Sequence, residues 1–309
     1  MLLRFLPLFL FLPLSLLAQQ DSDNQTVVRD RPETKMQPPQ IYLLRGLSRE
    51  HSHWSEEFLE ALTTQFKGGN YTFMDLPGAG DYHDERAMMS VVKMAEFLHE
   101  THADSLAAHR GNNILLATSL GGIVALEWLD RYPEDFDGVI MVSSGFKGIC
   151  KGSERVRPGA KLTTLSILLT GKMPKREQKL LNINSNFHQK DTVLLNEWIA
   201  IQEERPITRG AMIKQGLGGM FYKPKKKKVV VPMLILGSYG DQLVHPDCIC
   251  DVADWFKGEM AFHHSAGHGI PIDAPQWIVE VSSEWWERQL ALKRAGAEKK
   301  IIEQGDGKP

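Results

Sequence analysis

The sequence predicts an α/β protein with a mainly parallel sheet of about six strands and helices on both faces of the sheet. Three observations lead to this fold class. Short apolar runs of strand length alternate along the chain with longer segments in which apolar residues recur at helical spacing. Turns that contain glycine and proline separate the two kinds of segment. The composition, with 42% hydrophobic and 24% charged residues among 309, is that of a globular protein long enough to bury a core without disulfides.

The first half of the chain contains four predicted strands with helices between them. Each strand is a short apolar run bounded by turn residues, and the first helix is assigned from apolar residues that recur near i, i+4. In chain order these elements are a strand at 41–44, a helix at 54–66, a strand at 71–75, a helix through 91–98, a strand at 114–116, a helix at 123–129 and a strand at 138–143.

Residues 147–228 interrupt this alternation. The segment is polar in several stretches, and it contains an amphipathic helix in which Leu194 and Trp198 share an apolar face. We therefore expect a helical lid inserted into a core formed by residues 39–146 and 229–291. The alternation resumes with a strand at 229–236, a helix at 248–256, a strand at 260–264, a helix at 275–290 and a flexible tail at 292–309.

The amino terminus predicts export. Residues 1–18 combine one arginine, an apolar core and a final small residue, Ala18, which is the arrangement of a secretory signal peptide. The alternative is a retained anchor helix, but the apolar core is shorter than the roughly 20 residues that span a bilayer. We therefore expect cleavage after Ala18, a polar linker at 19–38, no stable membrane insertion after cleavage, and a periplasmic or secreted protein.

The formal net charge of −2 gives no reason to expect a polyanionic partner. Proteins that bind nucleic acid or acidic membranes usually carry a basic excess, so no nucleic-acid partner is predicted. The lysine-rich residues 225–228 are interpreted as a solvated loop. Residues 78–80 are interpreted as a turn, because they lack the third glycine of a dinucleotide-binding loop. No cofactor is predicted.

A serine lies at the corner between a predicted strand and a predicted helix. Ser119 follows the apolar run at 114–116, and the small residues Ala117, Gly121 and Gly122 surround it. Such a corner lifts the hydroxyl into the crevice at the carboxyl ends of the strands, in a strained backbone conformation that needs small neighbours. The pattern predicts a nucleophile at Ser119. The alternative is a structural serine in a turn, where small neighbours are also common.

A serine nucleophile needs a base, and the base needs an acid that orients it. Asp241 follows the strand expected at 229–236, and His268 lies in a glycine-flanked loop after the next strand. One helix and one strand fit between them, as a βαβ crossover requires. We therefore predict Asp241 as the acid and His268 as the base. The backbone N–H groups of Leu47 and Leu120 are the predicted oxyanion donors, because they follow the first strand and the serine.

Other residues could take these roles. Asp241 could simply begin a turn before the following helix. The clustered histidines also raise the alternative of a metal site, but no ligand set with recognisable zinc spacing joins them, so no metal is predicted. The competing residues are Asp247, Asp251 and Asp254 for the acid and His263 and His264 for the base, with His51 and His53 as further potential metal ligands.

The chain has three cysteines, Cys150, Cys248 and Cys250. An odd number leaves at least one thiol unpaired within the chain. The strands that precede Cys150 and Cys248 are expected to be neighbours, so a bridge from Cys150 to Cys248 or to Cys250 would suit an oxidising compartment. The simpler expectation is that all three are separate thiols, packed as small apolar groups.

Together these residues resemble the α/β-hydrolase superfamily over about residues 41–290. The order serine, aspartate, histidine is the one found in that superfamily. Two residues depart from its pattern, since Arg45 replaces the usual histidine and Ala117 replaces the first glycine of G-x-S-x-G. The matching motifs are Arg45-Gly46 through Trp54, Asp75-Leu76-Pro77-Gly78-Ala79-Gly80, Thr118-Ser119-Leu120-Gly121-Gly122, Tyr132-Pro133, Gly240-Asp241, and Gly267-His268 with Pro275.

The resemblance implies the fold of the small capped esterases, including those that hydrolyse acyl-carrier esters, with the lid inserted after the fourth parallel strand. It also implies that the sheet opens with the strand at 41–44, because the chain after Ala18 leaves no room for the antiparallel hairpin of larger relatives. We expect the lid to turn the apolar faces around Leu194, Leu195 and Trp198 toward Ser119. A serine nucleophile disfavours epoxide and haloalkane chemistry, for which members of this superfamily use an aspartate.

The sequence therefore predicts a serine hydrolase that cleaves a small-molecule carboxylic ester or thioester through an acyl-enzyme intermediate. Two alternatives stay open: a catalytically silent binding protein on the same fold, and a serine peptidase or amidase of the same superfamily. The intact set of Ser119, Asp241 and His268 argues against a silent protein. A peptidase would need a pocket for a peptide amino terminus.

Overall fold

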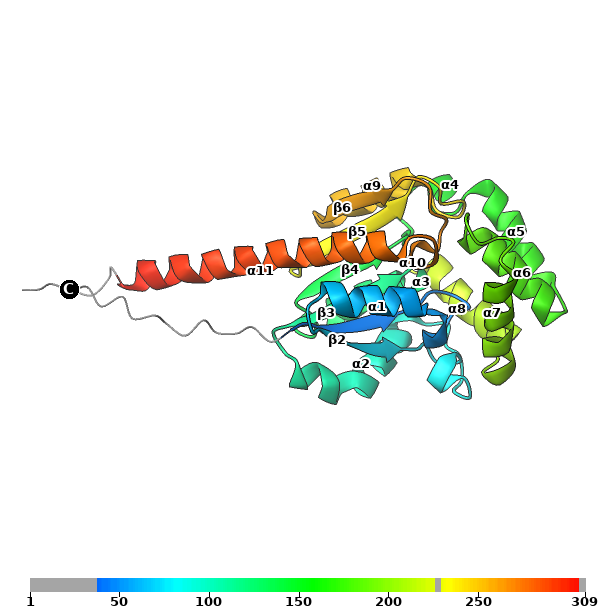
Figure 1. The fold of residues 1–309 in the computed structure, drawn as a ribbon, viewed down its shortest axis with the longest axis horizontal. Helices are drawn as coiled ribbons and strands as arrows, with labels where there is room; N and C mark the ends of the chain where they lie inside the picture. Colours follow the sequence, from blue (N-terminus) through cyan, green and yellow to red (C-terminus); the bar gives the residue numbers. More distant parts are fainter. Residues whose placement is uncertain (1–37, 226–228, 306–309) are drawn as a thin grey trace, which may run out of the picture. The chain divides into compact units, whose positions relative to one another are not determined.

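The computed structural model describes residues 38–225 and 229–305, with side chains as far as residue 297. The predicted signal peptide and all but the last residue of the predicted linker lie outside them. The described residues form one parallel sheet with helices around it, which confirms the predicted fold class (Figure 1). Its strands lie in the order β2-β1-β3-β4-β5-β6, where β1 is Gln40–Leu44, β2 Asn70–Met74, β3 Asn113–Thr118, β4 Gly138–Val142, β5 Met233–Ser238 and β6 Glu259–His263.

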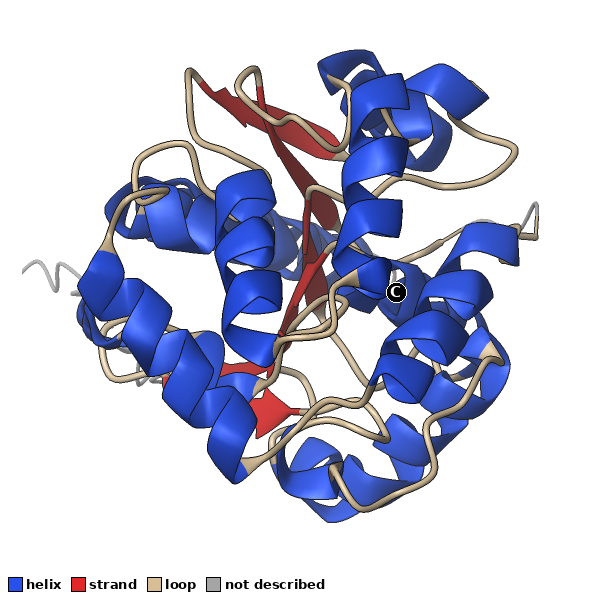
Figure 2. Cartoon of the chain, turned by 90° about the vertical axis from the view of Figure 1, so that its right-hand side faces the viewer, coloured by secondary structure: helices blue, strands red, loops and turns tan. Residues whose placement is uncertain are grey.

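The helices cover both faces of this sheet, with the strands between them (Figure 2). The short helices η1 (His51–His53) and η2 (Gly80–Tyr82) follow β1 and β2. The α-helices are α1 (Glu56–Gln65), α2 (Val91–Ala108), α3 (Leu120–Arg131), α4 (Gly152–Arg155), α5 (Pro158–Leu169), α6 (Met173–Asn184), α7 (Thr192–Glu204), α8 (Arg209–Phe221), α9 (Pro246–Phe256), α10 (Ile270–Asp273) and α11 (Pro275–Gly305).

Side chains alternate between two cores along each central strand. In β1, Tyr42 and Leu44 pack with α2, α3 and α9, whereas Ile41 and Leu43 pack with α1, α10 and α11. This period of two follows from the pleat of a strand. Because both faces are covered, every residue of β1, β3, β4 and β5 is buried, as expected for an interior parallel strand.

The prediction of a strand at 229–236 is wrong at its amino-terminal end. The ladder of β5 begins at Met233, which pairs with Val139. Proline has no N–H to donate, and Pro232 contributes only its carbonyl, which accepts from the N–H of Val139. Val230 is 77% exposed, so the run of valines before the strand leads to the sheet without entering it.

The last helix is longer than predicted. It was expected to end near residue 290 and to be followed by a tail from 292, but α11 continues to Gly305. Residues 291–305 are rich in alanine, lysine, glutamate and arginine, which are strong helix formers, and no proline interrupts them. The side chains of residues 291–297 are exposed, so intrinsic propensity and not burial accounts for this part of the helix.

The segment between β4 and β5 is mainly helical, as predicted, and contains α4 to α8. Figure 1 shows α5, α6 and α7 grouped at one end of the sheet. The contacts of α6 and α8 with the loops after β1 and β6 identify this end as the carboxyl ends of the strands. In parallel α/β sheets that is the end where ligands bind.

Candidate active site

Ser119 occupies the corner between β3 and α3. Its φ of 52° lies in the left-handed region, which a residue with a side chain adopts only under strain of about 1–3 kcal/mol. Two hydrogen bonds hold it there: its N–H donates to the carbonyl of Val142 at 2.8 Å, and the hydroxyl of Ser144 donates to the Ser119 carbonyl at 2.9 Å. The predicted corner and its strained serine are therefore present.

Small residues around Ser119 allow the corner to pack. A methyl group on Gly121 would lie 2.7 Å from the carbonyl oxygen of Arg45, and one on Gly122 would lie 2.1 Å from the hydroxyl oxygen of Ser144. Both positions thus require glycine. Ala117, which replaces the first glycine of the usual motif, is a buried residue of β3 that pairs with β1 and β4. Its methyl group fits as part of the core.

His268 joins Ser119 to Asp241, as predicted. The Nε2 atom of His268 lies 2.9 Å from the hydroxyl oxygen of Ser119, and its Nδ1 atom lies 2.9 Å from Oδ2 of Asp241. With the proton on Nδ1, the ring donates to Asp241 and accepts from the serine hydroxyl. The other carboxylate oxygen of Asp241 accepts from the N–H groups of Leu243 and Val244 at 2.7 and 3.0 Å, which fixes its orientation.

Two residues that sequence reasoning missed support this arrangement. The side-chain amide of Asn186, in the loop after α6, donates to the carbonyls of Gly240 and Ser265, both at 2.9 Å. Asp273 accepts from the N–H groups of Gly267 and Asn186 at 2.7 and 2.8 Å. The loops of Asp241 and His268 are therefore linked to each other through the inserted segment. No local sequence pattern marks Asn186 for this position.

The competing residues lie elsewhere. Asp247, Asp251 and Asp254 belong to α9, and the N–H of Asp247 donates to the ring of His245. His264 is exposed. The Nδ1 atom of His263 accepts from the N–H of Ala266 at 2.8 Å, so this histidine stabilises the turn before His268. Burial lowers the pKa of His263.

The loop after β1 lies directly against Ser119. A methyl group on Gly46 would stand 2.9 Å from Cβ of Ser119 and 3.6 Å from the backbone nitrogen of Leu120. Leu47 is the next residue of this loop, and Leu120 is the first residue of α3, whose N–H has no acceptor within the helix. In the described part of the chain, neither of these N–H groups donates to a backbone or side-chain acceptor. The two predicted oxyanion donors thus flank the serine.

Helix α8, rather than α7, covers this region. A methyl group on Gly219 would lie 2.6 Å from the Leu120 side chain, and one on Gly216 would lie 3.4 Å from the Leu47 side chain. The expectation that the apolar face around Trp198 turns toward Ser119 is not met. Trp198 of α7 is buried against the guanidinium of Arg49 and the ring of His53, because the loop after β1 offers a cation and an aromatic edge there.

A group of possible metal ligands lies at the ends of β1 and β2. The group consists of Glu50, His51 and Asp75, each of which offers one possible ligand atom, and these three atoms lie within 4.8 Å of one another. These atoms already have partners: Nδ1 of His51 is hydrogen bonded to Asp75, and Glu50 is paired with Arg205. The hydrogen bond to Asp75 raises the pKa of His51. The hydrogen bonds and ion pairs among these side chains and with Arg205 therefore account for their clustering without a metal ion.

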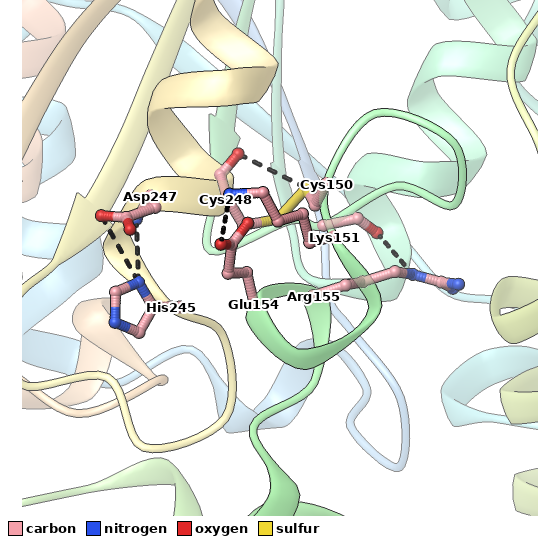
Figure 3. The surroundings of a disulfide bond; sticks show 8 residues. Cys150, Lys151, Glu154, Arg155, His245, Asp247 and Cys248 are labelled. Carbon is pink, nitrogen blue, oxygen red and sulfur yellow. Dashed lines mark hydrogen bonds and ion pairs between the residues drawn. A yellow bond between two sulfur atoms is a disulfide. The ribbon is translucent and has the colours of Figure 1, made fainter.

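Cys150 and Cys248 form a disulfide, with their Cα atoms 4.9 Å apart (Figure 3). The simpler expectation of three separate thiols is wrong, and Cys250 is the free cysteine. β4 and β5 are neighbours, so the chain after each strand emerges at the same edge. The bridge fixes the beginning of the inserted segment to α9. Arg155 lies nearby, and its guanidinium donates to the carbonyls of Gly219 and Met220, at the end of α8, at 2.7 and 2.8 Å.

Two cavities of about 400 and 520 Å³ lie far from these residues. Both border Val230, Pro232 and Gln289, beside α11 and the amino-terminal end of β5. Neither is lined by Ser119 or His268. The hydrogen-bonded geometry, and not cavity size, therefore identifies the candidate site.

A family model described as "Serine aminopeptidase, S33" matches residues 39–272. The chain belongs to this family of α/β-hydrolases. Membership of this family supports hydrolase activity. No curated protein matches the sequence.

Solved structures share the fold of this α/β-hydrolase at low sequence identity. The esterase RhEst1 from Rhodococcus sp. ECU1013 is 16% identical with a TM-score of 0.63, over 80% of this chain and 90% of that one. A proposed aryl esterase from Burkholderia cenocepacia is 17% identical with a TM-score of 0.67, over 82% and 92%. BpoC from Mycobacterium tuberculosis, a proposed non-heme bromoperoxidase, is 16% identical with a TM-score of 0.64, over 81% and 92%.

None of the helices within residues 38–225 and 229–305 of this α/β-hydrolase combines the length and the hydrophobicity needed to cross a bilayer.

Proposed function

We propose that this hydrolase is a serine esterase that cleaves a small-molecule carboxylic ester or thioester through an acyl-enzyme intermediate. The observation that carries the proposal is the pair of hydrogen bonds from His268 to Ser119 and Asp241. A hydroxyl is a poor nucleophile near neutral pH, and an imidazole nitrogen 2.9 Å away can accept its proton during attack.

In the proposed mechanism, the oxygen of Ser119 attacks the substrate carbonyl while Nε2 of His268 takes the serine proton. Asp241 holds the ring in the required tautomer and stabilises the imidazolium. The N–H groups of Leu47 and Leu120 donate to the carbonyl oxygen as it becomes negative. His268 then protonates the leaving alcohol or thiol, and the acyl group stays on Ser119. A water molecule, deprotonated by His268, attacks the acyl group. His268 then returns the proton to the oxygen of Ser119 as the ester bond breaks, so the acid is released and free Ser119 is regenerated.

An aminopeptidase is the second candidate, because the matching family model carries that description. An aminopeptidase needs a carboxylate for the ammonium of its substrate. Each buried carboxylate among the described residues already has a partner, which favours the ester proposal. The pairs are Glu50 with Arg205, Asp75 with His51, Glu127 with Arg131, Asp135 with His99, Glu177 with Arg49, Asp241 with His268, and Asp273 with Ser185.

A direct experiment separates these candidates. The purified protein is treated with a fluorophosphonate probe, then assayed with p-nitrophenyl esters of increasing acyl length and with aminoacyl p-nitroanilides. The proposal expects labelling of Ser119 and hydrolysis of the esters in preference to the anilides. Faster cleavage of the anilides would establish the peptidase, and absence of both labelling and turnover would establish a silent binding protein.

Export and a substrate-selecting role for residues 147–228 belong to the same proposal. The disulfide supports an oxidising compartment, since such bonds rarely persist in the cytosol. The contacts of α8 with Leu47 and Leu120 support a lid that limits the acyl groups that enter. Amino-terminal sequencing of the mature protein tests the first point, with Gln19 as the expected first residue. Replacement of Gly216 by leucine, beside Leu47, should restrict the accepted acyl length.

A further inference from the structure

Arg49 closes the turn that carries the candidate oxyanion donor of Leu47. The N–H of Arg49 donates to the carbonyl of Gly46 at 3.3 Å, across the turn. Ser48, within the turn, has a φ of 61° and is buried, so the backbone is strained there. The guanidinium Nη1 of Arg49 donates to the carbonyl of Ser48 at 2.8 Å. Both the main chain and the side chain of Arg49 therefore hold this turn.

The inserted segment holds Arg49 in turn. Oε2 of Glu177, on α6, lies 2.9 Å from Nη1 of Arg49, and the guanidinium stacks over the ring of Trp198, on α7, at 3.8 Å from its centre. The Arg49 side chain is 4% exposed and that of Glu177 is 1% exposed. This ion pair is inside the protein, where a charge is stable only beside its counter-ion.

The charge balance makes the turn depend on the position of α6. Burial lowers the pKa of Arg49, and the carboxylate of Glu177 opposes that effect. Moving α6 away would leave a buried guanidinium without its carboxylate, so the turn and α6 are stable together. A second ion pair, from Arg205 to Glu50 at 3.3 Å, ties the same loop to the end of α7.

We infer that Arg49 is a positioning residue for the oxyanion donor, and that Glu177 and Trp198 make its position depend on the inserted segment. Arg49 does not touch the reacting atoms; it acts through the turn that places the N–H of Leu47. The inference rests on the proposed hydrolysis by Ser119. It adds that the docking of α6 and α7 assembles the oxyanion site, so loss of the pair should reduce kcat more than it changes KM.

The test uses variants that separate positioning from stability. Removing one partner of a buried pair leaves an unpaired charge and typically costs about 3–5 kcal/mol, whereas replacing both partners by apolar residues is often neutral. The double variant Arg49→Met/Glu177→Leu is therefore expected to fold, with a Tm above that of Glu177→Leu alone but below the wild-type value, because Arg176 loses its 3.5 Å contact with Glu177. We expect its kcat to fall about 100-fold, as for loss of one oxyanion donor, with KM within a factor of about three. Glu177→Gln keeps a hydrogen-bond acceptor for Arg49 but removes the negative charge that holds the guanidinium, so its kcat should also fall, by less than in the double variant.

Affinity for an alkyl boronic acid provides the readout that a merely structural role would not change. The boronate forms an anionic tetrahedral adduct with a reactive serine, so its Kd should rise in the double variant by about the factor lost in kcat/KM. The control is Arg288→Met/Glu259→Leu, which removes an exposed 2.9 Å ion pair between α11 and β6. This variant should change neither kcat/KM nor the Kd for the boronic acid.

Unchanged kcat and boronate affinity in a folded double variant would overturn the inference, as would a rise in KM alone. If the double variant does not fold, a wild-type kcat in Glu177→Gln would also overturn the inference. Failure of the proposed function is a different result, because the wild-type protein itself would then hydrolyse no ester.

Discussion

Gly46 lies against Ser119: a methyl group added to Gly46 would stand 2.9 Å from Cβ of Ser119 and 3.1 Å from the carbonyl oxygen of Thr118. Cβ contacts under 3.0 Å, such as the one with Ser119, essentially do not occur, so the loop after β1 reaches the serine only because position 46 has no side chain. This closeness is what brings Leu47 beside the corner between β3 and α3.

Gly46→Ala should therefore impair turnover more than stability. The added methyl group pushes the loop away from Ser119 and displaces the N–H of Leu47. Loss of one oxyanion donor lowers kcat by about 100- to 1,000-fold, and we expect a reduction of that order with a change in Tm of only a few degrees. Steady-state kinetics and thermal unfolding measure the two effects. The matched control is Gly159→Ala on α5, where no atom lies within 4 Å of the added methyl group.

Ser119→Ala and Ser119→Gly should both abolish hydrolysis and yet differ in stability. Alanine keeps the unfavourable φ of 52°, whereas glycine adopts it freely. We expect Ser119→Gly to have the larger free energy of unfolding, by about 1 kcal/mol, because relief of backbone strain exceeds the added chain entropy of glycine. Urea unfolding of the two variants checks this. Ester hydrolysis at the wild-type rate by either one would contradict the proposed mechanism.

The buried residue His53 should make the protein less stable in mild acid. Burial, with Arg49 and Arg45 nearby, holds the pKa of His53 well below its ordinary 6.5. Below pH 6.5 the unfolded chain binds a proton at His53 that the folded protein does not bind. The stability that comes from a neutral His53 is therefore fully present above pH 6.5. As the pH is lowered below 6.5, the free energy of unfolding falls by at most about 1.4 kcal/mol per pH unit.

The variant His53→Gln, whose amide oxygen can replace Nδ1 as the acceptor for the N–H of Glu50, isolates this effect. Urea unfolding between pH 7.5 and 5.5 should show a steeper loss for the wild type than for His53→Gln. His51→Gln serves as a control of opposite sign, because Asp75 raises the pKa of His51. The stabilisation from His51 is present below its unfolded pKa and is lost as the pH rises through its folded pKa. Parallel profiles for wild type and His53→Gln would refute the prediction.

Removing the disulfide should destabilise the protein. Cys150 and Cys248 are 98 residues apart, so the bridge restricts a long loop of the unfolded chain, and its loss typically costs about 2–5 kcal/mol. Cys150→Ala/Cys248→Ala should show this loss in urea unfolding, whereas Cys250→Ala should not. Thiol counting in denaturant without reductant should find one thiol per chain. A count of three would mean that the bridge does not form.

The sequence predicted the sheet well because its signals are local. Apolar runs bounded by turn residues located all six strands, and the glycines beside Ser119 located the corner. Errors arose where a local pattern was misleading. The valines before β5 have strand propensity, but Pro232 and the register with β4 place the start of the ladder at Met233. Helix propensity also extends α11 beyond the predicted end near residue 290, through the exposed residues 291–297.

The candidate site residues were predicted from their order and from the strand that each one follows. In a parallel sheet the carboxyl ends of all strands meet at one edge, so Ser119, Asp241 and His268 had to emerge near one another. Their hydrogen bonds depend on side-chain orientation, which the packed loops decide. Asn186 shows this, since its amide bridges the carbonyls of Gly240 and Ser265 from a segment that no motif marks.

The sequence by itself thus determined the fold class, the corner at Ser119 and the candidate acid and base, because these depend on short-range patterns and on strand order. Only the tertiary structure decided which cysteines pair, which helix covers the serine, and that Arg49 is held by Glu177. Those contacts join residues that are distant in the chain, and their choice depends on packing and on the pairing of buried charges. Neither leaves a periodic signal in the sequence.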